Sequence, residues 1–410
     1  MKILMIAPQP FFEPRGTPIS IYQRLNGLSM LGHEVDLLTI HIGMDVDIPG
    51  VRIQRTMPIS FIKNIPIGPS AAKLFLDILL FFKAFRVLLR NRYDAVHSHE
   101  EAAFFAMILA KIFRVPHVYD MHSSLPKQLE NFKFGNGRFF IRLFKALEGA
   151  VMRSCDVAMS VGVDLEDYVK ENYPTTNHIR VENTAVHNNI PVNEKKARQL
   201  RCDLGLDEDR FIVAYTGNFE QYQGIDLVLQ AAQKLIEETP ALAILLVGGN
   251  PEQIVQRKAE VREMGLSQHV IFTGTVPLMD SLLYLHIADV LVSPRTEGLS
   301  IPLKIYSYLY AGKPTLATNI YAHTQLLTDD MAMLVDPTPQ GVFDGLQQLI
   351  SSAQLRHRLA ENAYNFASET YSMDSYLAKL EEAYDSINVS THVDELAPSV
   401  TKSKTHSALS

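Results

Sequence analysis

The sequence is poor in several residue types that mark common protein classes. Its 410 residues include no tryptophan and only two cysteines, Cys155 and Cys202. Because no CxxC pair occurs, a disulfide scaffold and a zinc ribbon are excluded and a reducing cytoplasm is expected. No G-x-G-x-x-G follows the first strand and no G-x-x-x-x-G-K-[ST] occurs. The phosphate cradles of dinucleotide-binding and P-loop proteins are therefore missing.

Positive charge and long apolar runs are also scarce. There are 38 Lys and Arg residues against 45 Asp and Glu residues, a net charge of −7, so we expect no nucleic-acid partner. The most apolar stretch, Leu74–Phe82, contains Asp77 and is well short of the ~18 residues that span a bilayer. We expect a cytoplasmic protein that at most attaches to the inner face of the membrane.

What the chain does contain is a repeated alternation of strand and helix patterns. Lys2–Ala7 is a continuous apolar run typical of a buried parallel strand. Thr17-Pro18 then begins a helix, and Glu34–Ile40 forms the next strand. The alternation restarts at Phe211–Thr216 after a charged, irregular stretch. We therefore predict two Rossmann-like α/β domains that face each other across a cleft.

The same patterns predict the boundaries of these units. Residues 1–190 form the N-terminal domain, 191–210 a linker and 211–372 the C-terminal domain. Residues 373–390 form a final helix that can pack back on the N-terminal domain. Residues 391–410 are polar without an apolar period, and we expect them to be disordered.

Loops at strand ends carry the candidate functional residues. Gly16 precedes a helix whose free N–H groups suit an anion, and His122 ends a buried strand. Gly217 lies in a glycine-containing loop, and Arg295, Glu297 and Lys304 gather where a later strand gives way to a helix. An ordinary turn, a structural histidine and surface salt bridges are the respective alternatives. We set aside zinc at His97 and His99, expecting these side chains on opposite faces of their strand.

Taken together, the pieces resemble a family 4 glycosyltransferase of the GT-B fold over roughly residues 1–390. No single signature carries the resemblance; it lies in their order and spacing. The pieces are Arg15-Gly16-Thr17, Gly32–Val35, Tyr93–His99, His122, Glu182-Asn183, Tyr215–Asn218 with Gln223-Gly224, Leu246–Gly249, Val270–Pro277, Ala288–Pro294, Glu297-Gly298 and Ala311–Thr318.

The resemblance implies retaining transfer of a sugar from a nucleotide diphosphate sugar, with no metal and no cofactor. The C-terminal domain would take this donor and the N-terminal domain the acceptor. Gly16 would lie against the diphosphate and His122 against the transferred sugar. The backbone around Thr275 and Val276 would contact the base. Sugar and phosphate would be held by Glu297 and the loop that follows it, Gly298, Leu299 and Ser300.

The sequence departs from the family pattern at the phosphate-binding positions. The second glutamate usual in the family is absent, and Ser307 is the weaker candidate for its contact with the ribose. The usual Arg and Lys of the first phosphate loop are here Asn218 and Gln223. We hypothesise that Arg295 and Lys304 replace these two cations.

Composition is the only guide to the acceptor, which we expect to be a glycan, a lipid-linked molecule or a small molecule. Residues 61–92 and 133–153 combine basic and aromatic side chains, which suits peripheral contact with an anionic membrane. The same composition fits helices that pack on the sheet through their aromatic side chains and keep the charged ends of Lys and Arg in water at the edge of the contact. The alternatives to a transferase are a non-catalytic subunit that binds sugar nucleotides or glycans, and a nucleotide-sugar epimerase of the same fold.

Overall fold

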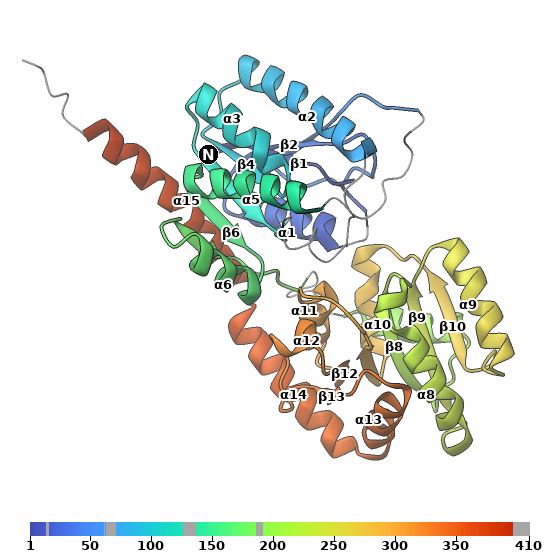
Figure 1. Ribbon diagram of the computed structural model, residues 1–410. Helices are drawn as coiled ribbons and strands as arrows, with labels where there is room; N and C mark the ends of the chain where they lie inside the picture. The colour runs from blue at the N-terminus through green and yellow to red at the C-terminus, as the bar shows by residue number, and fades with distance from the viewer. Residues whose placement is uncertain are drawn as a thin grey trace, which may run out of the picture.

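The computed structural model describes residues 1–13, 16–60, 62, 71–124, 126, 137–185 and 192–396, with the backbone alone at 71, 137–140 and 388–396. These residues form two domains, each built on a parallel β-sheet (Figure 1). The predicted pair of Rossmann-like domains is confirmed. Arg15, a member of the first predicted motif, lies outside the described residues.

The N-terminal sheet has seven strands in the order β3-β2-β1-β4-β5-β6-β7. They are β1 (Lys2–Ala7), β2 (Glu34–Thr39), β3 (Val51–Arg55), β4 (Ala95–His99), β5 (His117–Met121), β6 (Val157–Ser160) and β7 (His178–Arg180). The strand order reverses between β1 and β4, and ligands of open α/β sheets bind beyond the carboxyl ends of strands at such a point. The loops after β1 and β4 therefore lie where sheets of this kind bind ligands, and the loop after β5 follows the next strand of the sheet.

Helices cover both faces of this sheet: α1 (Gly16–Met30), α2 (Ala71–Arg90), α3 (Ala102–Phe113), α5 (Gly137–Ser154) and α6 (Val163–Asn172). Alternate residues of a strand point to opposite faces. Met5 accordingly packs with Leu25 of α1 on one face, whereas Leu4 packs with Leu80 of α2 and Leu109 of α3 on the other. None of the described helices is both long and apolar enough to cross a membrane.

The C-terminal sheet has six strands in the order β10-β9-β8-β11-β12-β13. They are β8 (Phe211–Gly217), β9 (Leu242–Gly248), β10 (Val270–Gly274), β11 (Val290–Ser293), β12 (Thr315–Thr318) and β13 (Met333–Val335). Here the order reverses between β8 and β11, which are neighbours in the sheet. The two loops that the sequence analysis selected in this domain follow these two strands and therefore lie side by side.

The helices of this domain begin at recognisable caps. Asn250 forms a capping box with Gln253, and the side chains of Thr338 and Ser352 accept backbone N–H groups at two further helix starts. The helices are α7 (Glu194–Asp203), α8 (Ile225–Glu238), α9 (Pro251–Glu263), α10 (Ser281–Ile287), α11 (Leu303–Tyr310), α12 (Tyr321–Thr324), α13 (Pro339–Ser351) and α14 (Ala353–Thr370), with short 3₁₀ turns η1 (Gln221–Gln223) and η2 (Leu278–Asp280).

Two segments differ from the sequence-based expectation. Helix α7 lies within segment 191–210, where an irregular conformation was predicted; Asn193 caps it and Ala197 anchors it in the core. Helix α15 (Met373–Leu396) continues six residues into segment 391–410, where disorder was predicted. No proline interrupts the helix before Pro398. A proline disfavours the helical conformation of the residue before it, so the helix is expected to end close to this point. Residues 397–410 lie outside the described part of the chain.

Helix α15 leaves the C-terminal domain and runs along the N-terminal one (Figure 1). Tyr376, Leu380 and Tyr384 are buried in the same core as α1 and β1. Gly27 of α1 permits this close approach, because a Cβ there would lie 2.8 Å from the Tyr376 ring and 2.9 Å from Leu380. Helix α15 is thus part of the N-terminal fold.

We expect Leu380→Ala to destabilise the N-terminal domain. Leu380 is 0% exposed, and removing such a side chain typically lowers the free energy of unfolding by about 2–5 kcal/mol. Urea denaturation followed by fluorescence of the tyrosines would measure the loss. The exposed Glu381 supplies the control: Glu381→Ala should change stability by less than about 0.5 kcal/mol. Equal stabilities of the two variants would contradict the docking of α15.

Candidate functional site

A buried ion pair lies at the centre of the N-terminal domain. Oδ2 of Asp120 on β5 accepts a hydrogen bond from Nε of Arg24 on α1 at 2.8 Å, and both side chains are 0% exposed. Arg24 also donates to the hydroxyl of Tyr376 at 3.0 Å and to the carbonyl of Val181 at 2.5 Å. One guanidinium therefore connects α1, β5, α15 and the segment after β7.

Three histidines surround the same carboxylate. His97 and His99 on β4 and His122 after β5 each have a ring nitrogen 3.5–3.7 Å from an Asp120 oxygen. Nδ1 of His99 lies 2.9 Å from Nε2 of His122. The expectation that His97 and His99 point to opposite faces was wrong, because residues two apart on a strand share a face. Their ring centroids are 4.7 Å apart.

Burial and charge set the protonation of this cluster. Burial lowers the pKa of His122 to about 4 and that of His99 well below its ordinary value. Burial alone would raise the pKa of Asp120, but Arg24 outweighs it and holds that pKa well below the usual range. At neutral pH the cluster therefore contains one compensated carboxylate and neutral imidazoles.

The cluster also has a spacing that could suit a metal. Ligand atoms of His97, His99 and Asp120 all lie within 4.8 Å of one another, and imidazole and carboxylate are zinc ligands. However, the guanidinium of Arg24, 2.8 Å from Oδ2, already neutralises the Asp120 carboxylate and would repel a cation beside it. We therefore assign no metal here and treat the group as a buried polar cluster.

Glu100, directly after β4, was not singled out from the sequence. Its φ of 47° lies in the left-handed region that non-glycine residues rarely adopt. Ser123 donates to its Oε1 at 3.3 Å. Burial, together with the neighbouring Glu101 carboxylate, raises the pKa of Glu100 to about 7. The sequence signal that could have identified Glu100 is the pair of acidic residues, Glu100 and Glu101, directly after the strand pattern that ends at His99.

A second polar cluster lies where β8 and β11 end in the C-terminal domain. Nζ of Lys304 on α11 is 3.3 Å from Oε1 of Gln223 and 3.7 Å from the centroid of the Tyr215 ring. The guanidinium of Arg295 lies 5.0 Å from the centroid of the Tyr222 ring. Within the described part of the chain, no carboxylate forms an ion pair with Arg295 or Lys304.

The two cations are held near each other, and no described residue supplies a counter-charge. Burial lowers the pKa of Lys304 well below its ordinary value, and Arg295 lowers it further. Two glycines leave room for them: a Cβ at Gly217 would lie 3.0 Å from Nζ of Lys304, and one at Gly298 would lie 2.6 Å from Cζ of Arg295. An arrangement of this kind favours an anionic ligand.

Other predicted residues lie around this cation pair. The side chain of Asn218 accepts the N–H of Glu220 at 3.3 Å, and the carbonyl of Ser300 accepts a hydrogen bond from Arg295 at 3.2 Å. Ser307 is half-buried on α11, about one turn after Lys304. The structure thus brings together Gly217, Gln223, Arg295, Gly298, Ser300 and Lys304.

The remaining predicted residues are not joined to the cation pair by a described contact. Glu297 and Leu299 are exposed in the loop after β11. Thr275 donates to the carbonyl of Gly249 at 3.2 Å, which links the ends of β9 and β10, and Val276 follows it half-buried. Gly16, the first residue of α1, is exposed.

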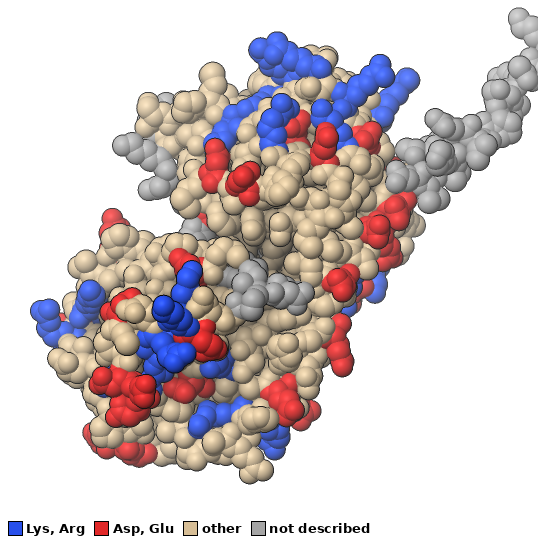
Figure 2. All heavy atoms as spheres, turned by 180° about the vertical axis from the view of Figure 1, so that it is seen from behind, with Lys and Arg blue, Asp and Glu red and all other residues tan. Residues whose placement is uncertain are grey.

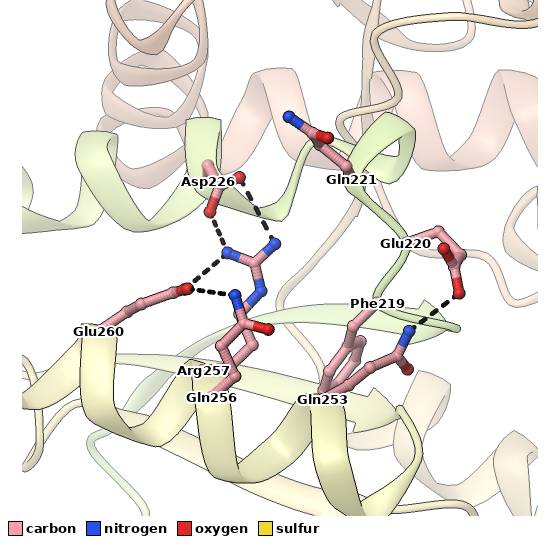
Figure 3. Close-up of a pocket in the computed structure, with 8 residues that line it drawn as sticks. All are labelled: Phe219, Glu220, Gln221, Asp226, Gln253, Gln256, Arg257 and Glu260. Atoms are coloured by element: carbon pink, nitrogen blue, oxygen red, sulfur yellow. Dashed lines mark hydrogen bonds and ion pairs between the residues drawn. The ribbon is translucent and has the colours of Figure 1, made fainter.

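A cavity of about 420 Å³ lies on α8 and α9, beside η1 (Figure 3). Its charged and amide groups mostly bond one another: Arg257 pairs with Asp226 and Glu260, and Gln253 donates to Glu220 at 3.0 Å. These pairs leave it without the unpaired cations seen at Lys304 and Arg295. We therefore place the candidate site at the strand ends and not in this cavity.

Two family models match the chain in succession. The one described as Glycosyltransferase Family 4 matches residues 14–187, and the one described as Glycosyl transferases group 1 matches residues 196–366. The first covers most of the N-terminal domain and the second most of the C-terminal domain. They meet near the segment that contains α7.

Individual proteins are similar along nearly the whole chain. An uncharacterized glycosyltransferase of Methanocaldococcus jannaschii is 24% identical, with 94% of this chain and 98% of that protein covered. A phosphatidyl-myo-inositol mannosyltransferase of Mycobacterium tuberculosis is 23% identical, with 94% and 97% covered. Anabaena HepE, solved with UDP and glucose, has a TM-score of 0.73 at 16% identity, with 94% and 99% covered.

Proposed function

Because the chain belongs to glycosyltransferase family 4 and has the GT-B fold, we propose that it transfers a sugar from a nucleotide diphosphate sugar with retention at the anomeric carbon. The observation that carries this proposal is that two neighbouring cations, Arg295 and Lys304, lie beside Gly217 and Gln223. Among the described residues, neither forms an ion pair with an acid. A diphosphate supplies the negative charge that this pair lacks. Anabaena HepE has been solved with UDP-glucose, which makes UDP the first probe.

The cation pair also explains how the leaving group would be stabilised. Negative charge grows on the diphosphate as the sugar–oxygen bond breaks, and positive groups already in place lower the energy of that transition state. In other transferases a divalent metal neutralises such charge. Here two fixed side chains provide it, so we propose a reaction independent of metal and of any cofactor.

The remaining roles follow the family resemblance. His122 would contact the transferred sugar from the N-terminal domain, and Gly16 would face the diphosphate. Glu297 and the loop of Gly298, Leu299 and Ser300 would hold sugar and phosphate. Thr275 and Val276 would line the base, and Ser307 the ribose. The exposure of Glu297 and Gly16 leaves both open to a ligand.

For the acceptor, we propose a glycan or lipid-linked molecule reached at a membrane surface. A relative is named for its action on phosphatidyl-myo-inositol. Exposed apolar side chains cover one face of α2, α3 and α5, namely Leu74, Phe75, Ile78, Phe82, Leu89, Ile108, Ile112 and Leu143. We call this the α2–α3–α5 face. Parts of the predicted stretches 61–92 and 133–153, namely 61, 63–70 and 133–136, lie outside the described residues.

The charges on the α2–α3–α5 face match an anionic leaflet. Among the described side chains of these helices, the exposed charged ones are all basic: Arg86, Arg90, Lys111, Arg142, Lys145 and Arg153. Figure 2 shows basic side chains along the top of the N-terminal domain, where Figure 1 places α2 and α3. In a chain of net charge −7, this separation of charge favours contact with acidic lipid.

Removing either cation should weaken donor binding. We expect Lys304→Met and Arg295→Met each to raise the Kd for UDP by about tenfold, since hydrogen bonds to charged groups contribute about 1.5–3 kcal/mol. Calorimetry would measure Kd, after thermal shifts with UDP-, GDP- and ADP-sugars identify the base. Lys313→Met, which removes another partly buried lysine of this domain, is the control. Unchanged affinity in both test variants would refute the site.

Replacing His122 should slow turnover more than it changes folding. We expect His122→Ala to lower kcat for donor hydrolysis or transfer at least about tenfold and to retain cooperative unfolding. Release of the nucleoside diphosphate would be followed with a panel of sugar nucleotides, with and without chelator. Wild-type turnover by the variant would remove His122 from the reaction.

The same assay separates the competing functions. Donor binding without release of nucleotide would favour a non-catalytic subunit, which the altered Asn218, Gln223 and Ser307 motivate. Conversion of the donor sugar into its epimer without an acceptor would favour an epimerase. Loss of activity in chelator would contradict metal independence.

The α2–α3–α5 face should bind acidic vesicles. We expect the protein to float with phosphatidylglycerol vesicles and not with phosphatidylcholine vesicles, and to dissociate as salt rises. Phe82→Glu should abolish flotation, because Phe82 is 62% exposed on α2. Met279→Glu changes a similarly exposed apolar side chain of the C-terminal domain and should have no effect. Unchanged flotation of the Phe82→Glu variant would contradict membrane binding through the α2–α3–α5 face.

A further inference from the structure

Two histidines on neighbouring strands share one hydrogen bond at the end of the N-terminal sheet. His99 is the last residue of β4, and His122 follows β5; the two strands pair in parallel, with His99 opposite Asp120. Nδ1 of His99 lies 2.9 Å from Nε2 of His122, and the ring centroids are 5.2 Å apart. His99 is 0% exposed and His122 only 8%. Water therefore does not compete for this bond.

Both imidazoles are neutral at physiological pH because burial lowers their pKa values. A neutral imidazole has one N–H and one lone pair. One ring must donate in the nitrogen–nitrogen contact and the other must accept. The choice determines which nitrogen of His122 carries hydrogen, since the hydrogen bond at one ring nitrogen sets the state of the other.

The far side of the His99 ring decides between the two arrangements. Its Nε2 is buried and has no hydrogen-bond partner among the described residues. If His122 were the donor, His99 would have to carry its own hydrogen on Nε2, as a buried and unpaired N–H. Orphaned N–H groups are rare inside proteins, and unused acceptor sites are less so. His99 therefore carries its hydrogen on Nδ1 and donates it to His122.

We propose that His99 is a positioning residue that holds His122 in the tautomer with hydrogen on Nδ1, so that His122 offers an N–H to the donor sugar. This inference rests on the proposed contact between His122 and the sugar. With Nε2 occupied by His99, Nδ1 is the ring nitrogen that remains for a ligand. An N–H there donates to a sugar hydroxyl oxygen, whereas the other tautomer would present a lone pair.

The buried polar cluster around Asp120 packs against His99. Asp120 lies 3.7 Å from Nδ1 of His99 and is fixed by Arg24. Nε2 of His97 lies 3.5 Å from the same Asp120 oxygen, Oδ2, and Nδ1 of His97 is 2.7 Å from the hydroxyl of Tyr384 on α15. Every member of this chain is buried. His99, which contacts His122, is therefore surrounded by buried residues of β4, β5, α1 and α15.

The tautomer can be measured without any substrate. In protein labelled with ¹⁵N-histidine, we expect the His122 ring to show a protonated Nδ1 and an unprotonated Nε2, assigned by comparison with His122→Ala. His99→Leu should shift His122 away from this state. His99→Asn keeps an amide N–H near the position of Nδ1 and should restore it. Protonation of Nε2 in the wild-type protein would overturn the proposal.

Kinetics supply the second readout. We expect His99→Leu to lower kcat by about tenfold or more at nearly unchanged KM, and His99→Asn to recover most of it, because misplaced catalytic groups lose rate steeply. His117→Leu is the matched control, since Nε2 of His117 bonds Ser98 at 2.7 Å across the same two strands. It should lower stability and leave kcat unchanged. Wild-type kcat in folded His99→Leu would overturn the proposal.

The two readouts also separate this inference from the proposed function. If the spectra show hydrogen on Nδ1 of His122 while His122→Ala retains full turnover, His99 positions His122 as stated but His122 has no role in transfer. If His122→Ala is inactive and the spectra show hydrogen on Nε2, the proposed function stands and the role of His99 is wrong.

Discussion

The ion pair between Arg24 and Asp120 is the interaction on which the N-terminal half of the site depends. Removing two charges from water is unfavourable, and the attraction between them repays it only when their remaining hydrogen-bonding groups are satisfied. Arg24 meets this condition through Tyr376 and Val181, which come from distant parts of the chain. The ion pair therefore forms fully only when α15 has docked on α1. Closing the fold and completing the polar cluster are one event.

The two domains handle charge in opposite ways. In the N-terminal cluster the carboxylate of Asp120 is compensated and the imidazoles around it are neutral. In the C-terminal cluster Arg295 and Lys304 have no acid partner among the described residues, and burial disfavours the charge on both. The first cluster balances its own charge without a ligand, whereas the second has no balancing acid among the described residues. This difference fits the proposed roles, in which the first cluster orients the substrate and the second neutralises its charge.

The sequence was sufficient for the parts of the fold that depend on local pattern. Continuous apolar runs such as Lys2–Ala7 predicted buried parallel strands, and the repeated alternation predicted two domains. The short edge strands β3, β7 and β13 were missed, because a strand of three to five residues with a half-exposed face has little pattern of its own. Helix α7 was missed because charged residues dominate it and only Ala197 is buried.

The site was harder to predict, because its contacts join residues that are far apart in the chain. Gln223 and Lys304 were both selected from the sequence, but their approach depends on β8 and β11 being neighbours. Glu100 carried no motif, and its unusual φ became visible only in the structure. The prediction for His97 and His99 was wrong because it placed residues two apart on opposite faces of the strand, although the two-residue repeat of a strand puts them on the same face.

In the transfer reaction proposed above, the two clusters are complementary. As the bond to the diphosphate breaks, the sugar gains positive character and the leaving group gains negative charge. A neutral His122 can lie against the sugar without repelling it, whereas an imidazolium would oppose the growing positive charge. Arg295 and Lys304 would instead be charged when a diphosphate is bound, and its negative charge would favour the protonated form of Lys304, which burial and Arg295 disfavour without it. The substrate thus completes the electrostatics of the C-terminal domain, while the N-terminal domain is kept neutral by its own core.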